Sequence, residues 1–262
     1  MMFTLFFVDL GRKVLSFLYF LGGLASLAGQ TVYFTFRPPY KYGRIIEQGK
    51  KAGYDSFPLV SLISLFIGFI FALQTAYFMQ RIGSEMYIAS MVALSIVREL
   101  GPVITALVVA GRVGASNTAE IGSMQVTEQI DALETLAANP VKYLVVPRFV
   151  ALGVMLPVLT LYANIIGILG SYLICVVKLG ITSSMYMHVT FSALLYKDLF
   201  TGLFKSWIFG MLIALISCYE GFNVEGGAAG VGRATTRSVV FTFIMIIAAD
   251  CVFTALFYFI FP

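Results

Sequence analysis

Long, uninterrupted apolar runs dominate the pattern of this chain. Five runs are long enough to cross a membrane as helices, because a span needs about 20 apolar residues. We expect transmembrane segments at residues 58–80, 86–111, 149–177, 199–219 and 239–261. The runs are continuous, whereas the strands of a membrane β-barrel alternate between apolar and polar positions. The pattern therefore predicts an all-α polytopic membrane protein with a single domain over residues 1–262.

The first apolar stretch, residues 14–36, has more than one interpretation. It is long enough to span, but basic residues stand on both sides of it, which favours keeping both ends in the cytoplasm. We interpret residues 1–55 as an interfacial region whose apolar helix lies in the membrane surface or re-enters it. A true span is one alternative. A signal peptide is another, since residues 25–29 resemble a cleavage site, but we expect the segment to be retained.

Basic residues are unevenly divided between the two sides of the predicted spans. Twelve lie on one side and four on the other, and cytoplasmic loops carry the excess of Lys and Arg. The N-terminus and the loop between the second and third spans are therefore expected in the cytoplasm, with the C-terminus on the opposite side. The larger group is Arg12, Lys13, Arg37, Lys41, Arg44, Lys50, Lys51, Arg112, Lys142, Arg148, Arg233 and Arg237. The smaller group is Arg81, Lys178, Lys197 and Lys205.

Composition agrees with a membrane protein and excludes several classes. The chain is 60% hydrophobic and 11% charged, against about 45–50% and 25% in soluble domains. Its three cysteines form no CxxC pair and its single histidine has no neighbouring ligands, so we expect no metal site. A net charge of +4 without a basic stripe gives no reason to expect nucleic acid. Without a P-loop or a Ser/His/Asp set, we expect no cofactor and no catalytic residue in this chain.

Residues 117–138, between the second and third spans, are predicted to form one amphipathic helix. Asn117 and Glu120 resemble a capping box, and Asn139-Pro140 is a stop signal. The apolar face consists of Val126, Ile130, Leu133 and Ala137. The helix either joins two spans or offers a docking surface to a soluble partner. The candidate docking residues are Glu120, Met124, Thr127, Glu128, Asp131 and Glu134.

Three ionisable residues fall at membrane depth, where each costs about 2.5–3.5 kcal/mol on insertion scales. Arg98 and Glu99 lie in the second span and Asp250 in the last. We expect Asp250 to be a counter-ion for Arg98 or part of a polar patch. In the second span, Gly101-Pro102 comes shortly after Glu99. We expect it to break the helix, as in transporters whose broken helices line cavities. A purely structural role is the alternative for Arg98 and Glu99.

Two further patterns have weaker meanings. Phe71, Gln74, Phe78 and Ile82 form one face of the first span with Met79 beside it, which suits an acyl chain but is also explained by helix packing. Residues 221–238 are expected to be a glycine-rich loop, and no strand precedes them, so a dinucleotide site is not favoured. Arg233 and Arg237 in this loop are candidates for stabilising it or contacting a partner.

Three segments together resemble the MlaE-type permeases of the Mla/MCE phospholipid ABC transporters. They are VALSIVRELGP at residues 92–102, AEIGSMQVTEQIDAL at residues 119–133 and GRATTRSVV at residues 232–240. The resemblance extends from about residue 40 to the end of the chain, and the second segment is the most specific.

The resemblance implies a non-enzymatic permease that forms a homodimer in the bacterial inner membrane. It would dock a cytoplasmic ATPase, which binds ATP and Mg²⁺, through residues 117–138 acting as a coupling helix. A STAS-domain protein and a periplasmic ring of MCE lipid-binding subunits would complete the assembly. The cargo would be glycerophospholipid moved between inner and outer membranes, which maintains outer-membrane lipid asymmetry.

The resemblance also implies where the lipid lies. Its cavity would be lined by Phe71, Gln74, Phe78, Met79, Ile82, Arg98 and Glu99. Arg98 and Glu99 would contact the head group or hold the cavity in shape. Two other functions stay open: an ion-coupled secondary transporter with Arg98, Glu99 and Asp250 as a proton relay, and a non-transporting membrane scaffold. The absence of an inverted repeat counts against the secondary transporter.

Overall fold

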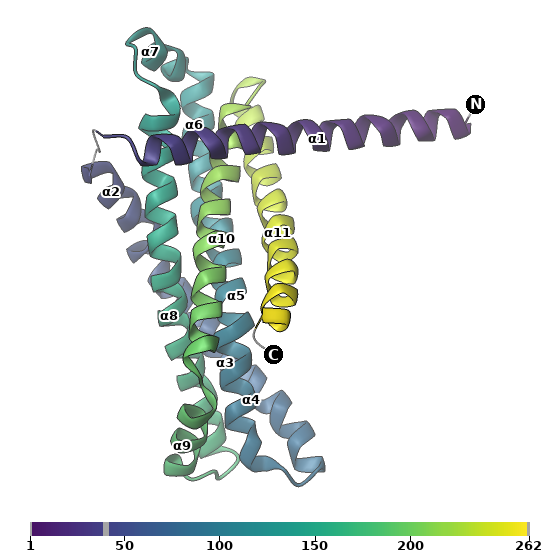
Figure 1. Cartoon of the computed structure of the whole chain (residues 1–262), viewed down its shortest axis with the longest axis vertical. Helices are drawn as coiled ribbons and strands as arrows, with labels where there is room; N and C mark the ends of the chain where they lie inside the picture. The colour runs from purple at the N-terminus through teal and green to yellow at the C-terminus, as the bar shows by residue number, and fades with distance from the viewer. Residues whose placement is uncertain (1, 39–41, 261–262) are drawn as a thin grey trace.

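Every regular element in the computed structural model is a helix (Figure 1). The structure describes residues 2–38 and 42–260, and no strand forms within these ranges. Lipid offers no partner to backbone N–H and C=O groups, so each apolar run satisfies them internally as a helix. Five helical segments are long and apolar enough to cross a membrane. The predicted all-α architecture with five spans is therefore confirmed.

The elements follow one another with short connections. The chain begins with α1 (Met2–Thr35), α2 (Tyr42–Ala52), η1 (Tyr54–Ser56) and the first span α3 (Phe57–Arg81). The second span comprises η2 (Glu85–Tyr87), α4 (Ile88–Ser95), η3 (Ile96–Leu100), α5 (Gly101–Val109), η4 (Ala110–Gly114) and α6 (Ala115–Val126). Then come α7 (Gln129–Thr135), η5 (Val141–Val145), the third span α8 (Val146–Val177) and α9 (Ser183–Ala193). The last two spans are α10 (Tyr196–Phe222) and α11 (Gly227–Ile260).

The second span continues far beyond its predicted end. It is helical from Glu85 to Val126, over 42 residues, which corresponds to about 60 Å and twice the hydrocarbon thickness of a bilayer. We call residues 85–126 the second-span rod. The predicted separate helix at residues 117–138 is therefore wrong in its first half, and Asn117 is buried within the rod instead of capping a new helix.

The break comes at Glu128, whose φ of 57° lies in the left-handed region. This conformation is uncommon for a residue other than glycine. The short helix α7 follows it, so the apolar positions expected on one continuous face are divided: Val126 ends α6, Ile130 and Leu133 lie in α7, and Ala137 lies beyond α7 with a φ of 53°. Periodicity alone cannot reveal such a break, because the spacing of apolar residues continues across it.

Two π-helical turns, η3 and η4, interrupt the rod without ending it. The expected break at Gly101-Pro102 is wrong. The π turn at residues 96–100 accommodates the proline, and the helix continues into α5. The Gly101 N–H donates to the carbonyl of Ile96, five residues earlier. Pro102 has no N–H to offer the carbonyl of Arg98, four residues before it, so that carbonyl is open to another donor.

The third span, α8, is the central helix of the bundle. Within its most apolar stretch 67% of residues are buried, against 11% for α11, the most exposed span. Close packing with α3 depends on small residues: a Cβ added at Gly68 would lie 2.0 Å from the carbonyl oxygen of Gly167. Small residues let helix backbones approach in a membrane, where van der Waals contact holds helices together.

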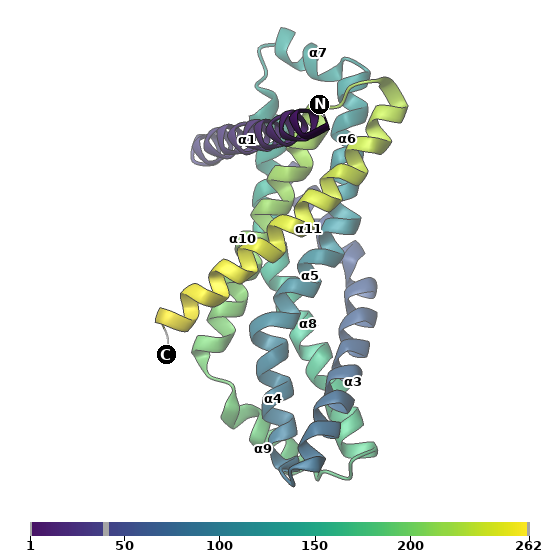
Figure 2. The same ribbon diagram turned by 90° about the vertical axis from the view of Figure 1, so that its right-hand side faces the viewer.

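Helix α1 lies across the bundle and not along it (Figures 1 and 2). Phe20 anchors it, with its ring centre 5.3 Å from Tyr219 and 4.7 Å from Phe241. This orientation differs from that of the five spans, and the position of α1 in a membrane interface stays a prediction. Among the residues counted for orientation, Lys41 and the side chains of Arg12 and Lys13 lie outside the described part of the chain.

The expected glycine-rich loop at residues 221–238 is mostly helical. Helix α11 begins at Gly227, and only residues 223–226 connect it to α10. Gly226 and Gly227 form the turn between them, with φ of 86° and 67°. A residue with a side chain would be strained at these positive φ values. In Figure 2, α11 then runs obliquely across the other spans.

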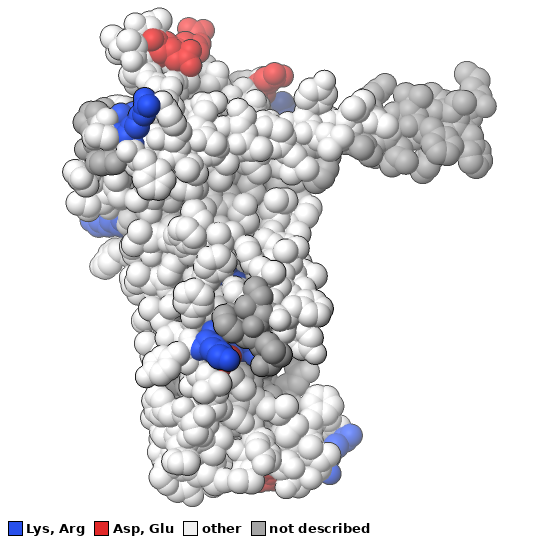
Figure 3. All heavy atoms as spheres, viewed as in Figure 1, with Lys and Arg blue, Asp and Glu red and all other residues white. Residues whose placement is uncertain are grey.

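Charged residues gather at the two ends of the long axis (Figure 3). On the face shown, acidic atoms lie at the end that carries α7, and most of the surface drawn between the ends is uncharged. One basic group interrupts this belt at mid-height on the face shown. Such a distribution is expected of a protein with a lipid-facing belt.

We predict that Gly68→Val separates α3 from α8 and lowers the free energy of unfolding by about 1–3 kcal/mol, because its Cβ would overlap the Gly167 carbonyl. Thermal unfolding of the detergent-solubilised chain, followed by Trp207 fluorescence, measures the change. Gly232→Val is the matched control, since nothing lies within 4 Å of a Cβ at that helical position. Equal melting temperatures for the two variants would contradict the packing argument.

Candidate functional site

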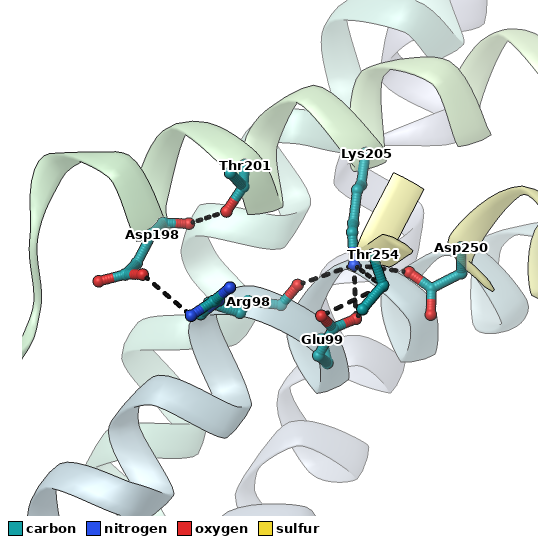
Figure 4. A network of polar contacts seen from close by, with 7 residues as sticks. All are labelled: Arg98, Glu99, Asp198, Thr201, Lys205, Asp250 and Thr254. Atoms are coloured by element: carbon teal, nitrogen blue, oxygen red, sulfur yellow. Dashed lines mark hydrogen bonds and ion pairs between the residues drawn. The ribbon is translucent and has the colours of Figure 1, made fainter. Parts of the chain in front are cut away.

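A cluster of charged side chains joins the second-span rod, α10 and α11 (Figure 4). At its centre is Lys205 of α10, whose side chain is 2% exposed. Its Nζ lies 2.5 Å from Glu99 Oε2 on the second-span rod and 2.9 Å from Asp250 Oδ1 on α11. It also donates to Thr254 Oγ1 at 2.7 Å. The ammonium is therefore neutralised and hydrogen-bonded, as a buried charge must be.

Arg98 forms a second, more open pair beside Lys205. Its Nη1 lies 3.7 Å from Oδ1 of Asp198, and the other oxygen of Asp198 accepts the backbone N–H of Leu195 at 3.0 Å. The Arg98 side chain is 43% exposed and that of Glu99 is 38% exposed. The cluster thus has a buried cation inside and an accessible arginine and carboxylate on its outer face.

Local backbone features bring α10 against the π turn. A Cβ at Gly202 would lie 2.2 Å from the Val97 carbonyl, so only glycine permits this approach. One turn later, Lys205 Nζ lies 3.5 Å from the carbonyl oxygen of Arg98. This is the carbonyl left open by Pro102, and it lies at the outer limit of a hydrogen bond from the ammonium.

Of the two expectations for Asp250, the pairing with Arg98 is wrong, because Asp250 pairs with Lys205 and Arg98 pairs with Asp198. Asp250 is instead part of a polar patch, the other expectation. Sequence analysis did not identify Lys205 as an intramembrane charge: it counted this lysine with the basic residues of one side, although the predicted span at residues 199–219 contains it. The signal was present: Lys205 stands between Phe204 and Trp207 in an apolar run that begins near residue 199. A lysine inside such a run is itself an intramembrane charge.

The candidate lipid-binding residues of the first span are divided by the structure. Phe71 and Met79 pack against the buried cluster that contains Val92 and Tyr186. Gln74, Phe78 and Ile82 are exposed, and Ile82 lies just beyond the end of α3. Arg98 and Glu99 contact α10 and α11 instead. A role for the first-span residues in lipid binding stays a prediction.

A pocket of about 500 Å³ opens at the α7 end of the bundle. We call it the polar groove, since charged and apolar side chains both line it. One wall is α2, with Arg44, Glu47 and Gln48. The opposite side is α6 and α7, with Glu120, Met124, Gln129, Ala132, Leu133 and Leu136. Its remaining lining comes from Tyr143, Leu144, Pro147 and Arg148 at the start of the third span.

An ion pair holds the rod against α8 beside this groove. Arg148, whose side chain is 3% exposed, lies 3.0 Å from Glu120 and donates to Asn117 Oδ1 at 3.3 Å. Glu120 also lies 4.0 Å from Lys51 of α2. Glu120 thus connects three elements, and its partners are internal, although sequence analysis placed it on a docking surface.

The other candidate coupling residues lie around the break after the rod. Glu128, Asp131 and Glu134 are exposed, and they account for acidic residues at the α7 end. Thr127 donates its hydroxyl to the Ser123 carbonyl at 2.8 Å. Met124 lines the polar groove. The structure therefore presents an acidic ridge above a partly apolar pocket.

The two arginines of the last candidate group have different surroundings. Arg237 lies 2.5 Å from Glu220, a buried carboxylate of α10, and so ties α11 to α10. Arg233 is exposed near the start of α11. Within residues 2–38 and 42–260, no group of three or more His, Cys, Asp or Glu is placed to hold a metal ion.

Comparisons with known proteins agree on one family. The profile of the family described as Permease MlaE matches residues 45–256. A probable ABC transporter permease protein of Rickettsia felis is 43% identical over 95% of this chain and 96% of its own length. A protein of the same description from Synechocystis is 38% identical over 86% and 85%. The chloroplast protein TRIGALACTOSYLDIACYLGLYCEROL 1 of Arabidopsis thaliana is 38% identical over 88% of this chain and 66% of its own length.

We predict that Lys205→Met lowers the free energy of unfolding by about 3–5 kcal/mol, because it leaves two carboxylates facing each other without a cation. Thermal unfolding in detergent measures the loss. Lys178→Met, at an exposed lysine beyond the end of α8, should be neutral. Adding Asp250→Asn to Lys205→Met should restore part of the stability, and a double variant no more stable than the single one would contradict the pairing.

Proposed function

This chain belongs to the MlaE permease family and is an ABC transporter permease, and we propose that its cargo is a glycerophospholipid carried between the inner and outer membranes of a bacterium. The observation that carries this proposal is the mid-depth charged cluster with its open outer face. A half-exposed arginine between uncharged, lipid-facing helix surfaces matches an amphiphile with a phosphate and acyl chains. The name of the Arabidopsis relative, which refers to a glycerolipid, supports the same class of cargo.

Arg98 is the residue that we assign to the phosphate. Its guanidinium lies 3.7 Å from Asp198, which orients it, and the side chain stays 43% exposed to a ligand. Glu99 is engaged by Lys205 and accepts from Thr254 at 3.2 Å, so it holds the shape of the site. Apolar side chains of the first span, Phe71 and Phe78 among them, would accompany the acyl chains.

A permease of this class works with a cytoplasmic ATPase, and that subunit would bind ATP and Mg²⁺. We place its docking surface on the acidic ridge of α7 and the polar groove beneath it. Glu128, Asp131 and Glu134 are exposed there and would attract a basic surface. The rod then links this surface to the π turn that carries Arg98, so movement of α7 would reach the lipid site.

The remaining parts of the assembly follow the family. Two copies of the permease would form a homodimer in the inner membrane, with the N-terminus in the cytoplasm and the C-terminus in the periplasm. A ring of MCE-domain subunits would receive or deliver the lipid on the periplasmic side, and a STAS-domain protein would accompany the ATPase. The names of the relatives, which are ABC transporter permeases, count against the ion-coupled alternative.

We predict that Glu128→Lys combined with Asp131→Lys abolishes assembly with the ATPase, because it reverses the charge of the ridge. Affinity purification of the tagged chain from native membranes, followed by native mass spectrometry, measures ATPase retention. Glu85→Lys, an exposed acidic residue at the opposite end of the bundle, is the control. Normal ATPase retention by the double variant would refute the docking assignment.

We also predict that Arg98→Gln lowers the affinity of the complex for phospholipid by about 10–100-fold, since one charge-assisted hydrogen bond contributes about 1.5–3 kcal/mol. The purified complex should then retain less phospholipid. Lipid extraction and mass spectrometry quantify the retained phospholipid. Arg81→Gln, an exposed arginine at the end of α3, should retain as much as the unaltered complex. Equal retention by both variants would move the phosphate site away from Arg98.

A further inference from the structure

Helix α2 has two unlike faces, and each lines a separate groove. Arg44, Glu47 and Gln48 face the polar groove. Ile45, Ile46, Gly49 and Lys50 line a second groove of about 640 Å³ between α2, the start of α3 and α8. We call this second pocket the apolar groove. Helix α2 therefore separates the two grooves, with polar and charged side chains on one face and mainly apolar side chains on the other.

Close packing of α2 on α8 shapes the floor of the apolar groove. Met155 of α8 lies over Gly53 and Gly49. A Cβ added at Gly53 would lie 2.0 Å from Met155 Cε, and a Cβ added at Gly49 would lie 3.8 Å from Met155 Cγ. The α8 wall continues with Val150 and Val154, and Val154 is 60% exposed. These surfaces suit a hydrocarbon chain, since ligand pockets of this size are lined mainly by apolar groups.

Only two lining residues carry polar atoms on their side chains, Lys50 and Tyr54. Tyr54 is 69% exposed, and Ile46 beside it is 71% exposed. Both stand where the chain passes from the α7 end into the first span. Tyrosine and lysine at this level of a membrane protein typically meet lipid head groups.

Lys50 differs from its neighbour Lys51 in having no acidic partner among the described residues. Lys51 pairs with Glu47 at 3.4 Å and approaches Glu120 at 4.0 Å. No ion pair joins Lys50 to an acidic residue in the described part of the chain. A lysine without an ion-pair partner among the described residues, beside a groove lined by apolar side chains, is complementary to an amphiphile with an anionic head group.

We propose that the apolar groove binds an anionic phospholipid of the cytoplasmic leaflet, with an acyl chain along α8 and the phosphate at Lys50. This site is distinct from the cargo site at Arg98 and requires neither ATP nor a partner subunit. It also differs from the polar groove, which α2 separates from it. The lipid would stabilise α2 in its position between the two grooves.

The test uses the full chain carrying Trp207→Phe and Tyr54→Trp, which leaves one tryptophan at the edge of the groove. It is reconstituted in mixtures of phosphatidylcholine and phosphatidylglycerol, with one of the two brominated along its acyl chains. Bromine quenches the tryptophan when that lipid occupies the groove. We expect phosphatidylglycerol to bind about fivefold more strongly than phosphatidylcholine, as one lysine near a membrane surface provides.

The matched variants are Lys50→Gln and Lys51→Gln in this reporter chain. Lys50→Gln should remove the preference, and Lys51→Gln, the same charge change one residue away, should leave it intact. Equal binding of the two lipids by the parent reporter chain would overturn the proposal, as would equal effects of the two variants. Absence of quenching by either lipid would show that protein covers the groove, and this too would overturn it. None of these outcomes depends on the assignment of Arg98 or on ATPase docking.

Discussion

The structure depends on the neutralisation of one buried ammonium group at membrane depth. Lys205 cannot stay charged there without partners, and it finds them on two other spans, in Glu99 and Asp250. This requirement fixes the second, fourth and fifth spans relative to one another. Gly202 removes the side chain that would keep α10 from the π turn. The charges therefore define the geometry of the site as much as they define its chemistry.

The second-span rod extends this geometry to the end of the bundle. It runs without a break from the loop after the first span to Val126, and Glu99 lies within it. At its far end, the Glu120–Arg148 pair ties it to α8, and the left-handed residue Glu128 turns the chain into α7. Under the proposed function, the docking surface on α7 lies just beyond the end of this rod, and the rod would couple it to the charged site.

Sequence analysis identified the membrane architecture, because length and continuity of apolar runs are sufficient to predict spans. It identified Arg98 and Glu99 as intramembrane charges, but not their partners, since helix pairing depends on rotations that one-dimensional spacing does not contain. Of the two expectations for Asp250, the pairing with Arg98 was wrong, and membership of a polar patch agrees with its contact to Lys205. Lys205 was counted with the charges on one side of the membrane, although the predicted span at residues 199–219 contains it. The helix at 117–138 was misread for a related reason: Glu128 adopts a left-handed conformation that its residue type does not signal. Arg148 was counted only as a loop charge, although it is buried against Asn117.

Helix α2 has a thermodynamic consequence beyond either groove. Because one short helix forms a wall of both, a ligand that shifted α2 on one face would change the free energy of binding on its other face. Linkage requires this effect to be reciprocal: if docking at the polar groove alters lipid affinity at the apolar groove by some factor, the lipid alters docking by the same factor. The lipid composition of the cytoplasmic leaflet would then act as an effector of the permease.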